Sequence, residues 1–134
     1  MKHLNLKNTA AQGFSLVEML VVIAVIGVIA AIAIPSIGSI NSSAQTATNQ
    51  RNAQSIVSMY QAGSAAGVIW TGSDRNSKIG AVVGGQSPTS GAFSGKSFKV
   101  PNLSTTDQAN SYIYIGYDTS GDLFYDKSGG QSST

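Results

Sequence analysis

Residues 13–34 read GFSLVEMLVVIAVIGVIAAIAI, and this stretch decides how the chain folds. From Phe14 to Ile34 the only polar side chains are those of Ser15 and Glu18. At about 1.5 Å of rise per residue, a helix over this run spans roughly 31 Å, which is about the thickness of the hydrocarbon core of a bilayer. The sequence therefore predicts a membrane-spanning helix over residues 14–34.

The carboxylate of Glu18 is the unusual feature of this run. A charged side chain within a spanning segment costs about 2.5–3.5 kcal/mol, and such residues usually mark a function and have a partner. The rest of the run offers few candidates for that partner. Glu18 is therefore predicted to take part in an interaction with another group.

The residues around Glu18 follow an ordered pattern. A short basic leader precedes Gly13 and Phe14, and then come a hydroxyl residue, two aliphatic residues, Glu18, an apolar helix and Pro35. This pattern closely resembles the class III leader and N-terminal helix of type IV pilins and type II secretion pseudopilins, and it covers roughly residues 1–60. The resemblance implies that a prepilin peptidase cuts after Gly13 and N-methylates Phe14, and that Glu18 helps to register subunits in a helical filament.

The physics of a buried charge agrees with this resemblance. Cleavage after Gly13 leaves a cationic amine at Phe14, and helices packed with an axial offset would bring Glu18 of one copy to the amine of a neighbour. An unpaired charge in a low dielectric is expensive, whereas a paired one is tolerated. Assembly is therefore expected to relieve the cost of inserting Glu18.

An ordinary secretory signal peptide is the alternative explanation of the N-terminus. It would use the same basic start and apolar run, and Ala31-Ile32-Ala33 offers a cleavage site of the A-x-A kind. The length of the run and the acidic residue near its start favour the prepilin-type leader. Lys2 and Lys7 precede the run and no Lys or Arg follows until Arg51, which places the N-terminus in the cytoplasm by the positive-inside rule.

Composition argues against catalysis and against a nucleic-acid partner. The sequence has no cysteine, and its one histidine is His3, inside the leader. A chain that starts at Phe14 would lack Ser-His and Cys-His nucleophile pairs and the usual zinc ligands, so no enzyme activity is expected. Without residues 1–13, six basic and six acidic side chains balance, so no specific nucleic-acid binding is expected. No cofactor is required by this sequence.

The chain is expected to contain four consecutive parts. They are a leader at 1–13, a transmembrane and assembly helix at 14–34, an amphipathic continuation of that helix at 35–63, and a globular β-sheet head at 64–134. Pro35 is expected to kink or melt the helix at the membrane boundary. The resemblance implies that Pro35 also has a role in assembly, because family filaments lose helicity near this region when they assemble. The predicted fold class is α+β, a pilin-like lollipop in which the long helix packs against a small antiparallel sheet. The helix is expected to meet the sheet through Ala53, Ile56, Val57 and Tyr60.

The head is predicted from short β-prone runs between turns. A hairpin is expected near the C-terminus with its turn at Gly121, and Thr105 and Gln108 have the spacing of a capping box at the start of a helical turn. The sheet is expected to bury Trp70, Ile113, Ile115 and Phe124. The candidate strands are 68–71, 79–83, 97–100, 112–117 and 122–126.

Two weaker motifs lie in the head. Asp118, Asp122 and Asp126 recur around the predicted turn and carry the oxygen ligands that calcium prefers, although the spacing is not that of an EF-hand. Major pseudopilins carry calcium in a C-terminal loop, so the resemblance also implies a calcium site here; the alternative is that these are ordinary turn and strand-end aspartates. Residues 91–97 superficially resemble a phosphate-binding loop, but the spacing is one residue short.

The sequence thus predicts a structural subunit that forms a homopolymeric filament. The resemblance implies a major-type pseudopilin of a type II secretion system as the first role and a type IV pilin of a surface pilus, for adhesion, motility or DNA uptake, as the alternative. It also implies an inner-membrane assembly platform, an assembly ATPase, and insertion in the bacterial inner membrane with the head in the periplasm. A secreted binding module cut after Ala33 is the third possibility.

Overall fold

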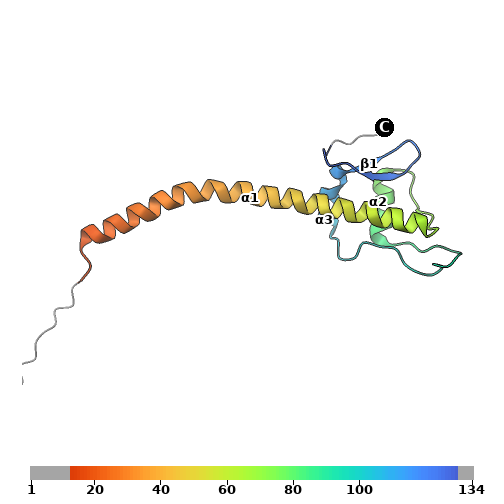
Figure 1. Ribbon diagram of the computed structural model, residues 1–134, viewed down its shortest axis with the longest axis horizontal. Coiled ribbons are helices and arrows are strands. Elements are labelled where there is room, and N and C mark those ends of the chain that lie inside the picture. The colour runs from red at the N-terminus through yellow and green to blue at the C-terminus, as the bar shows by residue number, and fades with distance from the viewer. Residues whose placement is uncertain (1–12, 130–134) are drawn as a thin grey trace, which may run out of the picture. The chain divides into compact units, whose positions relative to one another are not determined.

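The computed structural model of the protein describes residues 13–129, so the predicted leader lies outside the described residues except for Gly13. A long N-terminal helix and a small two-stranded antiparallel sheet give an α+β fold, as the sequence predicted (Figure 1). The chain divides after Asn41 into two compact units, which are described separately below. The elements are α1 (Leu16–Ala65), α2 (Arg75–Gly84), α3 (Thr105–Ser111), the 3-10 helix η1 (Tyr112–Tyr114), β1 (Ile115–Tyr117) and β2 (Leu123–Tyr125).

The first unit contains the apolar part of α1. The helix continues through Pro35 without a break, so it is not melted in this structure, and the ribbon curves gently along this part (Figure 1). A loss of helicity near Pro35 on assembly stays a prediction. Proline has no N–H to donate and disturbs the preceding turn of a helix. Two hydroxyls donate to backbone carbonyls beside it, Ser36 Oγ to Ile32 O (3.3 Å) and Ser39 Oγ to Ser36 O (2.9 Å). The helix ends at Ala65, close to the expected end at residue 63.

The second unit has one hydrophobic core, built on the last three turns of α1. Ala53, Ile56, Val57 and Tyr60 are buried there, as their spacing predicted. They pack with side chains from the loop after α1, from α2, from η1 and from the hairpin. These partners are Val68, Trp70, Ile79, Val82, Tyr114, Ile115 and Leu123.

Gly63 allows the loop after α1 to fold back onto the helix. A Cβ at this position would lie 2.3 Å from Cζ2 of Trp70, which is far inside van der Waals contact. The indole Nε1–H of Trp70 donates to the Tyr60 carbonyl (3.1 Å) and to Ser64 Oγ (3.0 Å). The large side chain is therefore buried with its one polar group satisfied.

Three predicted strands of the head are wrong. Residues 79–83 belong to α2, because Asp74 caps that helix by accepting from the Ser77 amide (3.0 Å), and because Ile79 and Val82 then share its buried face. Residues 68–71 form no regular element within the described chain, and 97–100 contribute only the bridge between Gln86 and Phe98.

The C-terminal hairpin is present but shorter than predicted. Residues 112–114 form η1 instead of strand, so β1 pairs with β2 only from Ile115 (opposite Tyr125) to residue 117 (opposite residue 123). Because residues 112–114 form a 3-10 helix and not a strand, the side chain of Ile113 is 41% exposed, contrary to prediction. Ile115 is buried, as predicted. Phe124 is half-buried, and its ring lies against Gly116, where a Cβ would approach it to 2.1 Å.

The short helix α3 forms where a helical turn was expected, but its cap is one residue earlier. Ser104 Oγ accepts from the Asp107 amide (3.1 Å) and donates to the Asp107 carboxylate (2.6 Å). The capping pair is therefore Ser104 and Asp107, and not Thr105 and Gln108.

Candidate assembly site at the start of α1

Ser15 and Glu18 form a reciprocal cap at the start of α1. The Ser15 amide donates to Glu18 Oε2 (2.9 Å), and the Val17 amide donates to Ser15 Oγ (3.3 Å). The glutamate half is that of a capping box, whereas the Ser15 hydroxyl accepts from the second helical residue, Val17, and not from the third; both bonds satisfy backbone donors that the helix itself cannot. The Ser-x-x-Glu spacing directly before an apolar run is the sequence signal that identifies such a cap, although Ser15 was not among the predicted capping residues.

The cap gives Glu18 a partner within its own chain. The carboxylate lies at the N-terminal end of α1, where the helix dipole favours negative charge. Cleavage after Gly13 would leave this cap intact, because the donor is the amide of Ser15 and the new amine would be at Phe14. The Oε2 atom of Glu18 therefore has a hydrogen-bond donor within its own chain. The sequence predicted a partner in a neighbouring subunit, and such a partner would be a second one.

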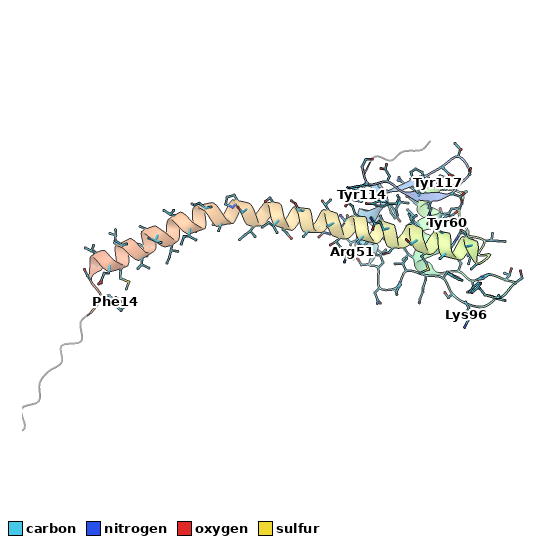
Figure 2. The ribbon with its side chains drawn as sticks, in the orientation of Figure 1. Phe14, Arg51, Tyr60, Lys96, Tyr114 and Tyr117 are labelled. Carbon is cyan, nitrogen blue, oxygen red and sulfur yellow. The ribbon has the colours of Figure 1, made fainter. Side chains whose placement is uncertain are left out.

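The surface around this cap is apolar. Phe14 is 81% exposed, and a shallow hollow of about 390 Å³ lies beside it. Figure 2 shows Phe14 at the beginning of the helix. The hollow is lined by Phe14, Val17, Glu18, Met19, Val21 and Val22.

The apolar side chains of α1 from Leu16 to Ile40 are exposed within the structure. An 18-residue window of this helix has a mean hydropathy of 2.9, so the helix is long and apolar enough to cross a membrane. Such a continuous apolar surface needs lipid or other helices to cover it. The stretch predicted to span the membrane therefore has the required geometry and exposure.

The three predicted calcium ligands have separate partners. Asp118 Oδ1 accepts from the Asp122 amide (2.7 Å), Asp122 Oδ1 accepts from the Tyr60 hydroxyl (2.6 Å), and Asp126 Oδ1 accepts from the Ser128 amide (2.9 Å). Within residues 13–129, no three His, Cys, Asp or Glu side chains are grouped so that they could hold a metal ion. Calcium binding by these aspartates stays a prediction.

Tyr60 instead fastens the hairpin to α1. Its side chain is only 5% exposed, and burial, together with the bond to Asp122, raises the pKa of Tyr60 to about 12. The Lys78 ammonium donates to the Gly121 carbonyl and lies 5.7 Å from the ring centre of Tyr60 and 5.5 Å from that of Tyr117. A cation close to aromatic ring faces is attracted to them. Tyr60 of α1 and Lys78 of α2 therefore both stabilise the turn of the hairpin.

Residues 8–34 match the family model of the prokaryotic N-terminal methylation motif. The chain carries the class III prepilin-type leader of the type IV pilin and pseudopilin family. Comparison with curated proteins and with solved structures gives no match. The motif contains Gly13, Phe14 and Glu18, so the leader implies processing by a peptidase and assembly into pilin-type filaments. The motif indicates a pilin-like structural subunit, and the apolar helix fits a membrane-anchored pilin.

Proposed function

We propose that the chain polymerises through α1 as a major-type pseudopilin of a type II secretion system. The observation that carries the assembly step is the combination at the start of α1. A capped carboxylate lies one turn from the residue that becomes the N-terminus, at the head of the exposed apolar part of α1. A methylated amine at Phe14 is still a cation, so it is a suitable partner for Glu18 of a neighbouring copy.

The proposed sequence of events follows from the chemistry of these groups. The chain inserts with its N-terminus in the cytoplasm, a prepilin peptidase cuts after Gly13, and the same enzyme methylates Phe14. The Glu18 carboxylate then accepts a second interaction from a neighbour's amine while it keeps its bond to the Ser15 amide. Two donors on one carboxylate lower the cost of keeping a charge in the lipid.

We assign the filament to a type II secretion system in preference to a surface pilus. The absence of cysteine from the sequence excludes the C-terminal disulfide that many pilus pilins carry, which favours a pseudopilin. An inner-membrane assembly platform and an assembly ATPase would supply the site and the energy for polymerisation. Filament growth would then drive folded proteins across the outer membrane.

Deletion of the gene in the native bacterium separates the two parts of this proposal. The proposal predicts that folded proteins which normally leave the cell accumulate in the periplasm, and that surface fibres are unchanged. Loss of surface fibres with normal export would instead assign the chain to a pilus. A Glu18→Leu variant should insert in the membrane normally and fail to form ordered filaments, and normal filaments from it would refute the role of Glu18.

A further inference from the structure

The helix α2 presents two cations to the C-terminal hairpin. The Asp74 cap starts α2 at Arg75, so Arg75 and Lys78, three positions apart, lie on one face of the helix. Arg75 Nη1 donates to the Ile115 carbonyl in β1 (3.4 Å), and the Lys78 ammonium donates to the Gly121 carbonyl in the turn. Both cations therefore bind carbonyl oxygens of the hairpin.

The turn of the hairpin accommodates the Lys78 ammonium closely. The nitrogen lies 5.5 Å from the ring centre of Tyr117 and 5.7 Å from that of Tyr60, and ring faces attract a cation. Gly121 has a φ of +85°, and a Cβ built there would lie 3.4 Å from Lys78 Nζ and 3.3 Å from the Tyr117 hydroxyl oxygen. Glycine at this position therefore both forms the turn and leaves room for the ammonium.

Several oxygens that this turn could offer a metal ion are bound by the protein's own donors. A calcium ion takes about six to eight oxygen ligands from carboxylates, carbonyls and water. Asp118 Oδ1 accepts from the Asp122 amide (2.7 Å), and Asp122 Oδ1 accepts from the Tyr60 hydroxyl (2.6 Å). The Gly121 carbonyl accepts from Lys78. The donor set of the turn therefore serves the fold of the head itself.

The charge of the hairpin is also balanced. The hairpin has three aspartates, at positions 118, 122 and 126. Arg75 and Lys78 bind its carbonyls, and Lys127 follows the last aspartate, so three positive charges oppose three negative ones. Calcium affinity depends on the number of charged ligands, and a fixed ammonium repels a divalent cation. The residues of this hairpin therefore do not fit the calcium ion that the family resemblance implies.

We infer that Lys78 is a built-in cation that takes the place of calcium in this hairpin, with Arg75 as a second support. The ammonium is carried on α2, so the head folds and keeps its hairpin without a metal ion. The inference goes beyond the proposed function, because it concerns the folding of each subunit and holds whether or not copies assemble. Subunits of this kind keep their stability when calcium is removed.

Thermal unfolding of the full-length chain in detergent tests the inference, with the fluorescence of the buried Trp70 as the signal of the head. The native chain should melt at the same temperature in millimolar calcium chloride and in EDTA. Lys78→Met keeps the apolar stem and removes the ammonium, so it should melt roughly 4–8 °C lower in EDTA. Lys78→Arg keeps a cation with N–H donors and should recover most of that loss. The matched control, Lys96→Met at an exposed lysine, should melt within about 1 °C of the native chain.

The response to calcium distinguishes a substitute cation from a side chain that only packs. Lys78→Met gives the hairpin one net negative charge and removes the donor from the Gly121 carbonyl. Calcium chloride should therefore raise the melting temperature of this variant by a few degrees and leave that of the native chain unchanged. Magnesium chloride at the same concentration is the control and should have less effect, because magnesium demands near-ideal octahedral geometry.

Three results would overturn the inference. They are a native chain that melts several degrees higher in calcium than in EDTA, a Lys78→Met variant as stable as the native chain, and a Lys78→Met variant that does not respond to calcium. If Lys78→Met does not fold, the native chain and Lys78→Arg decide: a response to calcium in either overturns the inference, and no response in both supports it. None of these results bears on the proposed function, which gene deletion and Glu18→Leu test separately.

Discussion

Replacement of Tyr60 by phenylalanine tests how the hairpin is held on α1. The change removes one hydroxyl and its 2.6 Å bond to Asp122, and it keeps the ring that packs at 5.8 Å from Trp70. A hydrogen bond to a charged group contributes about 1.5–3 kcal/mol. Asp122 is exposed, so solvent screening places the expected loss of unfolding free energy near the lower end, at about 1–2 kcal/mol.

The pKa of Tyr60 sets the pH dependence of the stabilisation. Burial is the first cause of its rise from 10.0 to about 12, and the bond to Asp122 is the second, so the rise is not a measure of that bond alone. A folded-state pKa above the unfolded value means that the stabilisation is complete below pH 10 and is lost as pH rises through about 12. Phenylalanine cannot ionise. The stability difference between the native chain and Tyr60→Phe should therefore be constant at neutral pH and shrink above pH 10.

The assay is thermal unfolding of the full chain in detergent, followed by circular dichroism from pH 7 to pH 12. Tyr125→Phe is the matched control, because that tyrosine is half-buried in the same hairpin and its change leaves the Tyr60–Asp122 bond in place. The control should keep the stabilisation that the Tyr60–Asp122 bond supplies. If Tyr60→Phe were as stable as the native chain at pH 7, with the same alkaline profile, the hydroxyl would not fasten the hairpin.

Three further predictions concern other contacts. Gly63→Ala should lower the unfolding free energy by roughly 1–3 kcal/mol, because the added Cβ would lie 2.3 Å from the Trp70 ring; unchanged denaturant unfolding would show that the loop yields freely. Ser15→Ala should weaken the cap by about 0.5–2 kcal/mol and speed hydrogen exchange of the first amides of α1, whereas Ser15→Thr should not; equal exchange in both variants would refute the cap. If the hairpin aspartates (118, 122 and 126) bind calcium, millimolar calcium should raise the melting temperature relative to EDTA; identical melting curves would remove the site.

The parts of the fold that sequence predicted correctly are those with long periodic or ordered signals. The apolar run from residue 14 to residue 34 and the stripe from Ala53 to Tyr60 are strong enough that tertiary context does not override them. The motif around Gly13 and Glu18 is likewise ordered over many positions. These signals were sufficient for the α+β class and for the methylation motif that the family model matches at residues 8–34.

The errors fall on short apolar runs. Residues 79–83 contain enough β-branched residues to resemble a strand. The Asp74 cap stabilises a helix there, and in a helix Ile79 and Val82, three residues apart, lie on the same buried face. Similarly, η1 rotates Ile113 away from the core, and no local pattern indicates that change. The Ser15 cap does have a local signal, the Ser-x-x-Glu spacing, but a carboxylate within an apolar run also indicates a buried charge, and the two interpretations compete at Glu18.

The mass of the N-terminal peptide of the mature protein, isolated from its native membrane, tests the central claim most directly. The claim is that processing exposes Phe14 beside the capped carboxylate of Glu18. It predicts a peptide that begins at Phe14 and carries one additional methyl group on its amine. A peptide that begins at Ile34, or one that retains residues 1–13, would contradict it.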